Sequence, residues 1–268
     1  MSVLLQLSDP HFGTEQAPVL EALVALAQHQ QPDLLVLSGD ITQRATRNQF
    51  AAARAFTDRL AAPLLLAIPG NHDIPLFDLR QRLFHPYARY RETFGNVLEA
   101  THASREWLVQ GVNTTRWYRH KGGAVSSAQI ERVARRLRAA EPGQLRVVVV
   151  HQPIGVLRAT EQHNLLHGHA QAQHSWAAAG CDVVLGGHIH LPYVMALAGL
   201  TRPMWAVQAG TCVSRRVRAG AANSVNVLRW GGDTAAGCCL IEQWDYSAAT
   251  QAFERTRVTE IHPAHTSE

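Results

Sequence analysis

The feature that most limits the fold of this chain is a set of short, uninterrupted apolar runs. They lie at Val3–Leu7, Leu34–Leu37, Leu64–Ile68, Val147–Val150 and Val183–Leu185. Such runs are typical of strands that are buried on both faces. Helical periodicity lies between several of them, at 20–27 and 130–137, and Ser126 and Gln129 have the spacing of a capping box before the second. Alternating strands and helices predict βαβ units and a largely parallel sheet.

The part of the chain after His190 has a different pattern. Strand-like runs separated by Gly, Pro, Asn and Asp lie at Tyr193–Ala198, Met204–Gln208, Ser224–Arg229, Cys238–Trp244 and Ala252–Val258. No clear helix separates them, so we expect this part to be antiparallel. Because the chain has no linker, repeat or low-complexity tract, we predict one domain at 1–258 of two packed sheets flanked by helices. A flexible tail is predicted at 259–268.

Composition narrows the classes of function. A hydrophobic fraction of 46% in 268 residues supplies a large core and excludes a disordered or fibrous chain. The net charge of +4 comes almost entirely from arginine, with Lys121 as the single lysine. The arginines are scattered or lie on the polar face of the predicted helix at 130–137, so they supply no continuous track for a nucleic acid. A nucleic acid is therefore not the expected partner.

The N-terminal segment and the cysteines bear on location. No basic residue precedes the first apolar run, and that run is too short for a signal peptide. No stretch approaches the ~20 apolar residues of a spanning helix, so membrane insertion is not expected. The cysteines, which have no CxxC spacing, are Cys181, Cys212, Cys238 and Cys239. Adjacent cysteines on a strand point to opposite faces and cannot bridge, so free thiols and a cytoplasmic location are predicted.

A polar motif directly follows each of the first five apolar runs. The motifs are Asp9-Pro10-His11, Gly39-Asp40, Gly70-Asn71-His72-Asp73, His151 and Gly187-His188-Ile189-His190. Because α/β sheets place ligand sites at the carboxyl ends of their strands, we expect these side chains at one rim. Carboxylate, amide and imidazole donors without a thiolate suit Mn, Fe, Co or Zn in a catalytic site. The pattern predicts a metal-dependent hydrolase.

Taken in order from Asp9 to His190, these motifs resemble those of the calcineurin-like metallophosphoesterases. The chain length and the Gly-Asn-His-Asp form are similar to those of the bacterial class III cyclic nucleotide phosphodiesterases. The resemblance implies a four-layer α/β/β/α sandwich of two mixed sheets flanked by helices, with two divalent ions (Mn, Fe, Zn or Co). It also implies hydrolysis of a small phosphodiester, with 3′,5′-cyclic nucleotides as one candidate, by in-line attack of a hydroxide shared by the ions.

The resemblance assigns a role to each motif residue. The first ion would be held by Asp9, His11, Asp40 and His190, and the second by Asp40, Asn71, His151 and His188. Asp40 would bridge them, because a carboxylate has two oxygens that can neutralise both ions. His72 would not be a ligand; it would protonate or stabilise the leaving group and, with Asn71, contact the substrate. Two interpretations of Asp73 have equal weight: it orients the His72 ring, or it is an ordinary turn residue.

Substrate contacts outside the motifs stay open. Arg44, four residues after Asp40, is a candidate donor to a phosphate oxygen, although a solvated residue at a helix start is the preferred interpretation. Four aromatic residues at 74–95 belong either to the core, which is favoured, or to a cap over the site: Phe77, Phe84, Tyr87 and Tyr90. Thr211 and the run Arg215–Arg218 line the opposite edge or form a hairpin surface.

Two other functions are open. One is a pyrophosphatase that acts on nucleotide or lipid-precursor conjugates. The other is a catalytically silent scaffold for protein interactions, which is disfavoured because decay should first remove ligands and none is missing. The expected partner is a small phosphodiester substrate, and the sequence leaves both a monomer and a homodimer open.

Overall fold

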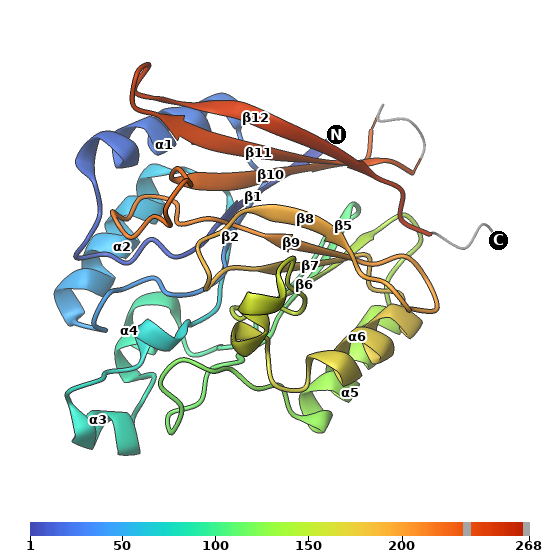
Figure 1. Cartoon of the computed structure of the whole chain (residues 1–268), viewed down its shortest axis with the longest axis horizontal. Helices are drawn as coiled ribbons and strands as arrows, with labels where there is room; N and C mark the ends of the chain where they lie inside the picture. The colour runs from blue at the N-terminus through green and yellow to red at the C-terminus, as the bar shows by residue number, and fades with distance from the viewer. Residues whose placement is uncertain (233–236, 265–268) are drawn as a thin grey trace.

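Two six-stranded sheets organise the computed structural model, which describes residues 1–232 and 237–264 (Figure 1). The first sheet has the order β12-β11-β10-β1-β2-β3. Its strands are β1 (Ser2–Leu7), β2 (Leu34–Leu37), β3 (Leu64–Ala67), β10 (Ser224–Trp230), β11 (Cys239–Ser247) and β12 (Ala252–Ile261). β1, β2 and β3 pair in parallel, whereas the three C-terminal strands join them through antiparallel pairs.

The second sheet has the order β4-β5-β6-β7-β9-β8. Its strands are β4 (Thr101–Ala103), β5 (Trp107–Gly111), β6 (Leu145–Val149), β7 (Val183–Gly186), β8 (Tyr193–Ala196) and β9 (Trp205–Gln208). The four central strands are parallel, and the two edge strands β4 and β8 are antiparallel to their neighbours. Both sheets are therefore mixed.

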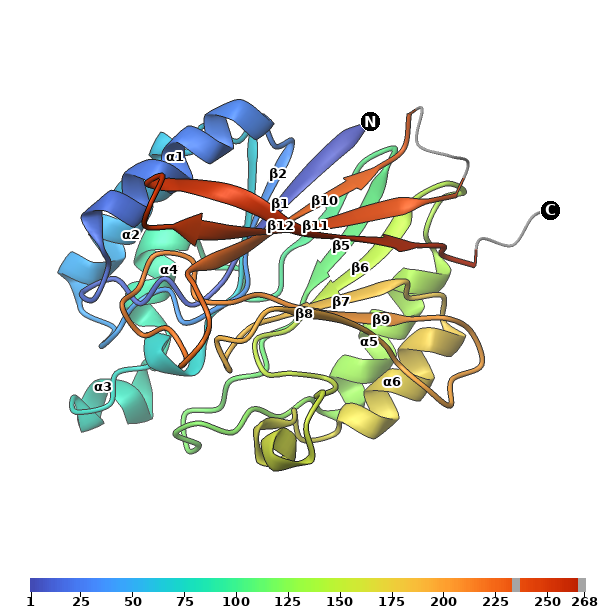
Figure 2. The same ribbon diagram turned by 45° about the horizontal axis from the view of Figure 1, so that its top comes forward.

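Helices cover the outer faces of the two sheets (Figure 2). The first sheet is covered by α1 (Ala17–Gln30), α2 (Arg47–Arg59) and α4 (Ala88–Phe94), and the second by α5 (Ser127–Arg138) and α6 (His169–Ala178). The short helix α3 (Leu79–Phe84) contributes no buried residue. The 3-10 helices η1 (Asn71–Asp73) and η2 (Ala159–Asn164) complete the set of helices in the described chain. The layers follow the order α/β/β/α, as the family resemblance implies.

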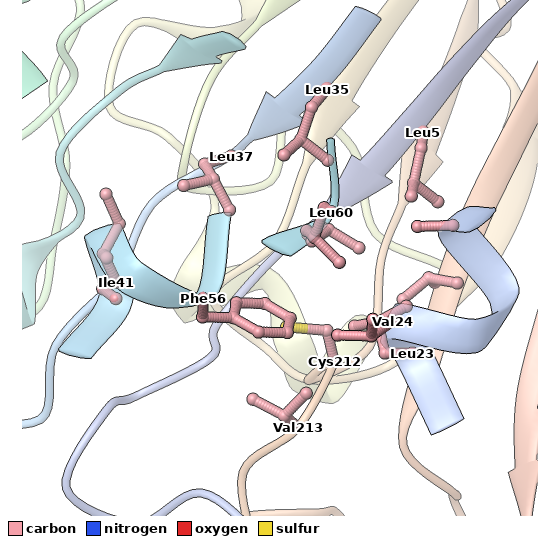
Figure 3. Packing of buried hydrophobic residues seen from close by; sticks show 14 of the residues in the cluster. Leu5, Leu23, Val24, Leu35, Leu37, Ile41, Phe56, Leu60, Cys212 and Val213 are labelled. Carbon is pink, nitrogen blue, oxygen red and sulfur yellow. The ribbon is translucent and has the colours of Figure 1, made fainter. Parts of the chain in front are cut away.

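Side-chain alternation explains why the apolar runs are uninterrupted. Leu35 and Leu37 of β2 point toward α1 and α2, where they pack near Phe56 (Figure 3). Leu34 and Val36 point the other way, into the core between the two sheets. Because successive strand residues face opposite sides, a strand between two apolar layers needs an apolar residue at every position.

The structure confirms the strands that the first five apolar runs predict, which are β1, β2, β3, β6 and β7, and the capping box of Ser126 and Gln129. The sequence did not predict β4 and β5. The prediction of a purely antiparallel C-terminal part is wrong at β9, which pairs in parallel with β7. The chain leaves β7, forms the edge strand β8 and then returns between them. Helix α6 gave no helical signal in the sequence because its residues are mostly His, Ala and Gln, which form no apolar stripe.

The predicted tail begins too early. Thr259 pairs with Ile241 and Ile261 with Cys239, so β12 continues to Ile261, which is buried. The prediction of a flexible tail is wrong for 259–261, because the apolar Ile261 closes the end of the core between the sheets. Residues 265–268 of that predicted tail lie outside the described residues.

The four cysteines are buried free thiols, as predicted. Within the described residues, no helix combines the length and the apolar character that crossing a membrane requires.

Candidate metal centre

The polar motifs follow the carboxyl ends of five strands and meet at one end of the sandwich. Asp9 and His11 follow β1, Asp40 follows β2, η1 follows β3, His151 follows β6 and His188–His190 follows β7. The first three strands belong to one sheet and the last two to the other. Both sheets therefore contribute side chains to a single site.

The backbone of this site is strained. Five of the nine non-glycine residues with positive φ in the described chain are motif residues: Asp9 (51°), His11 (44°), Asp40 (49°), His188 (71°) and His190 (54°). A left-handed backbone at such a residue costs on the order of 1 kcal/mol or more and persists only where surrounding contacts enforce it. At this site, the contacts that hold the side chains therefore outweigh the preference of each backbone for negative φ.

Two motif glycines allow segments from different strands to approach closely. A Cβ on Gly70 would lie 2.0 Å from the backbone nitrogen of Asp40, and a Cβ on Gly187 would lie 1.9 Å from Ser8 Oγ. Neither position has room for a side chain. The two glycines therefore keep the turn after β3 against the turn after β2, and the turn after β7 against the end of β1.

One group of donor atoms lies around Asp9. The Nε2 atoms of His11 and His190 are 3.0 Å apart. Asp9 Oδ1 lies 3.2 Å from His190 Nε2 and 3.6 Å from His11 Nε2. All three side chains are buried, and one atom of each converges on a volume that could hold a divalent ion.

A second group of donor atoms lies around Asp40. Asp40 Oδ1 is 3.2 Å from His151 Nε2, which in turn is 3.3 Å from Asn71 Oδ1. The His188 ring packs edge-on against His151, and Asp40, His151 and His188 form another cluster that could hold an ion. Asp40 Oδ2 faces the first group, 3.7 Å from His11 Nε2. The carboxylate of Asp40 thus faces both groups at once.

Backbone carbonyls orient two of these imidazoles. His151 Nδ1 donates to the carbonyl of Ser38 at 2.9 Å, and His190 Nδ1 donates to the carbonyl of Arg216 at 2.6 Å. Because a carbonyl can only accept, Nδ1 carries a proton in both rings and Nε2 is the nitrogen that faces the site. Metal-binding histidines in proteins are oriented in the same way.

Two buried donor atoms of the site lack a hydrogen-bond partner among the described residues, namely Asp9 Oδ1 and His188 Nδ1. Leaving a buried polar atom unpaired costs free energy, so both atoms fit ligands of an ion. Burial, and then the charge of His151, lowers the pKa of His188 to about 4, which keeps its ring neutral at pH 7. Burial alone would raise the pKa of Asp40, but the neighbouring His151 holds this pKa below its ordinary range. The donor set suits divalent ions.

Asp73 braces the loop that carries Asp40. Its carboxylate accepts hydrogen bonds at 2.8–3.0 Å from the backbone nitrogens of Ile41, Thr42 and Gly70. His72 Nδ1 donates instead to the carbonyl of Gln43 at 3.0 Å. The interpretation that Asp73 orients the His72 ring is therefore wrong, because the backbone nitrogens of two turns occupy its carboxylate. The alternative, a turn residue, describes it.

A cavity of about 250 Å³ opens onto these donors. Its lining consists of Asp40, Asn71, His72, Lys121, Asn164, His188, Ile189, His190, Arg216 and Arg218. Arg216 Nη1 lies 3.3 Å from His72 Nε2 and 3.0 Å from Gln43 Oε1. Within residues 1–232 and 237–264, no carboxylate forms an ion pair with Arg216, whereas Arg218 pairs with Glu161 at 2.7 Å. Arg216 therefore brings an uncompensated positive charge to the cavity.

Arg44 does not lie among the described residues that line the cavity. It is exposed, and its guanidinium carbon lies 5.2 Å from the centre of the Phe77 ring. The run Arg215–Arg218 lies in a loop beside the cavity, as one of its two interpretations holds. Within this run, Arg215 is exposed and Arg216 faces the cavity. Alternation along an extended loop is the signal that separates Arg216 and Arg218 from their neighbours.

The aromatic residues at 74–95 have different surroundings. Tyr90 is buried in the core beneath α2, as the favoured interpretation holds. Phe77 and Phe84 are exposed, with relative accessibilities of 78% and 66%, so the core interpretation is wrong for them. The reason is that α3 projects away from the first sheet and finds no apolar layer to pack against.

Comparison with known proteins agrees with the geometry. The sequence profile described as calcineurin-like phosphoesterase matches residues 2–192, which include all five motifs. A probable cyclic nucleotide phosphodiesterase from Synechococcus sp. (strain WH7803) is 30% identical in an alignment of 212 positions that covers 71% of this chain and 75% of that protein.

Solved structures share the fold. A dimetal phosphatase from Danio rerio has 10% sequence identity and a TM-score of 0.69, and the alignment covers 98% of this chain and 99% of that one. The purple acid phosphatase PPD1 from yellow lupin (Lupinus luteus) seeds has 11% identity and a TM-score of 0.72, over 97% of this chain and 53% of that one. At such identities the likeness concerns the fold alone. Because the family profile covers well over half of the sequence, the chain belongs to the calcineurin-like phosphoesterase family.

Proposed function

We propose that the chain is a dinuclear-metal phosphodiesterase that hydrolyses a small phosphodiester. The observation that carries this proposal is the position of Asp40, whose two oxygens face two separate clusters of ligand atoms. A carboxylate placed in this way can neutralise two ions and hold them at a short separation. The free thiols of the buried cysteines support a reducing, cytoplasmic location.

Each cluster contains the donors for one ion. Asp9, His11, Asp40 and His190 would hold the first ion, and Asp40, Asn71, His151 and His188 would hold the second. Two divalent ions supply a water of lowered pKa and positive charge beside the phosphoryl oxygens. Hydrogen bonds from His151 and His190 to the backbone carbonyls of Ser38 and Arg216 would hold these two rings in place before any ion binds.

His72 and Arg216 would act on the substrate directly. His72 Nδ1 keeps a proton toward the Gln43 carbonyl, so the ring would have to be doubly protonated for Nε2 to donate a proton to the departing oxygen. Arg216 would contact a phosphoryl oxygen. Its guanidinium lies beside His11 and His72, close to the proposed positions of the metal ions, and a phosphate between these positive charges would offset their repulsion. The bound phosphate would itself neutralise the charge of Arg216, so no carboxylate is needed beside this arginine.

The name of the Synechococcus relative supports a cyclic nucleotide as a candidate substrate. The small cavity of about 250 Å³ supports a compact ester rather than a polymer segment. We expect the metal-loaded protein to hydrolyse bis(p-nitrophenyl) phosphate and 3′,5′-cyclic AMP faster than p-nitrophenyl phosphate and a nucleoside diphosphate conjugate. A faster reaction with the conjugate would favour a pyrophosphatase. Two bound ions without any hydrolysis would favour the silent scaffold.

Replacement of Asp40 tests the bridge. In Asp40→Ala we expect metal content, measured by elemental analysis after removal of free ions, to fall from two ions per chain to one or none, because the two ions lose their shared anion. The control is Asp58→Ala, which removes an exposed carboxylate on α2 and should keep two ions. Two tightly bound ions in Asp40→Ala would contradict the bridging role.

Replacement of His72 tests the proton donor. A sugar alkoxide needs a proton to depart and p-nitrophenolate needs little, so His72→Ala should lower turnover of a cyclic nucleotide about 10²–10⁴-fold. The loss with bis(p-nitrophenyl) phosphate should be clearly smaller, and metal content should not change. His174→Ala, an exposed histidine on α6, is the control. Equal losses on both substrates would rule out proton donation by His72.

Replacement of Arg216 tests the phosphate contact. Loss of one charged hydrogen bond in Arg216→Gln should lower kcat/KM about 10–100-fold with full metal content. The neighbouring Arg215 is exposed and does not line the cavity, so Arg215→Gln is a matched control and should retain wild-type kcat/KM. Equal kcat/KM in the two variants would remove Arg216 from the substrate site.

A further inference from the structure

An unusual share of the exposed apolar surface lies in two short segments. Of the twelve large apolar side chains that are exposed among the described residues, six belong to these segments: Phe77, Leu79, Leu83 and Phe84 around α3, and Trp117 and Tyr118 between β5 and α5. Leu79 is 72% exposed and α3 has no buried residue. These side chains therefore contribute nothing to the core, and an apolar patch of this kind marks an interaction site.

The two segments form one surface. Arg82 of α3 donates to the backbone carbonyl of Arg119 at 3.0 Å, and the Tyr87 hydroxyl contacts Thr115 Oγ1 at 2.7 Å. The segment after Asp40 joins them, because Arg89 Nη1 donates to the carbonyl of Ala45. We call residues 42–48, 74–95 and 115–123 together the cap surface. Figures 1 and 2 both place α3 and the loop between β5 and α5 on the same protruding edge.

The cap surface is strongly basic. It contains nine arginines and lysines: Arg44, Arg47, Arg80, Arg82, Arg89, Arg91, Arg116, Arg119 and Lys121. Its only acidic residues are Asp78 and Glu92. This leaves sixteen of the 25 basic and nineteen of the 21 acidic residues for the rest of the chain. The positive net charge of the protein is therefore located on the cap surface.

The cap surface adjoins the catalytic cavity. Lys121 lines the cavity, and Gln43 at the other end of the surface accepts the hydrogen bond from His72 Nδ1. Anything that the cap surface binds would therefore lie next to the cavity mouth.

The chemistry of the surface favours one partner. A protruding helix with exposed leucines and phenylalanines, surrounded by arginines, matches what binds the boundary between lipid headgroups and acyl chains of an anionic membrane. A single-stranded nucleic acid would instead use aromatic platforms in a basic groove, and it gains little from the aliphatic Leu79 and Leu83. We propose that the cap surface docks peripherally, without a spanning segment, on anionic lipid bilayers.

Vesicle co-sedimentation tests the proposal independently of catalysis. The full chain should sediment with vesicles of equal parts phosphatidylcholine and phosphatidylglycerol at 0.1 M NaCl. It should stay in solution with phosphatidylcholine alone, and binding should weaken in 0.5 M NaCl, because salt screens the arginines. A chain that stays in solution with the anionic vesicles overturns the proposal, whatever its activity on phosphodiesters.

Paired variants separate docking from general effects. Arg80→Gln with Arg119→Gln should weaken vesicle binding about five-fold for each arginine, whereas Arg135→Gln with Arg138→Gln on α5 should not change it. Leu79→Ser with Phe84→Ser should weaken binding about ten-fold or more, and Leu64→Ser with Val258→Ser, which are exposed on β3 and β12, should not. Thermal unfolding of the Leu79/Phe84 variant should match wild type, because α3 has no buried residue.

Three outcomes would overturn the docking proposal. One is equal loss of vesicle binding in the cap variants and their controls. Another is a dimer in size-exclusion chromatography that Leu79→Ser with Phe84→Ser dissociates without any effect on vesicle binding, since the surface would then join two copies. The third is tighter binding of a 20-nucleotide single strand than of anionic vesicles at the same salt, lost in Arg80→Gln with Arg119→Gln.

Discussion

The carboxylate of Asp40 is the point on which the site depends. It accepts a hydrogen bond from the backbone of His72 and pairs with His151, which belongs to the other sheet. Its backbone is held in the left-handed region because Asp73 binds the next two backbone nitrogens and Gly70 leaves room for the turn. Asp40 therefore contacts residues of both sheets, and these contacts depend on how the two sheets pack against each other.

The geometry of the site lowers the folding stability of the protein when no ion is bound. Left-handed backbone at five motif residues, and buried atoms of Asp9 and His188 that have no hydrogen-bond partner among the described residues, each oppose folding. Three apolar layers offset this cost, because the strands that carry the motifs are buried on both faces. Ions that bind the folded state and not the unfolded chain would stabilise it further by mass action. Rigid strands thus hold a site that its own local preferences disfavour.

The residues around the cavity lie on less regular structure than the motif residues. The candidate metal ligands lie at the ends of strands, whereas Arg216, Lys121 and the cap surface lie on loops and short helices outside the sandwich. Such segments can vary without disturbing the core, since few apolar contacts depend on them. The fold therefore fixes the positions of the candidate ligands, whereas the residues that border the cavity can change without altering the fold.

The sequence predicts ten of the twelve strands in the described residues, but not β4 and β5, together with the order of the motifs and the family, because apolar runs and the donors after them are local patterns. It also indicated that Asp40 follows β2 and that His72 follows the amide side chain of Asn71. Tertiary packing, in contrast, determines that Asp73 braces a loop, that Arg216 rather than Arg44 lines the cavity, and that β12 extends to Ile261. It also gathered scattered arginines onto one surface. Each of these depends on contacts between residues far apart in the chain, which no local pattern of side chains encodes.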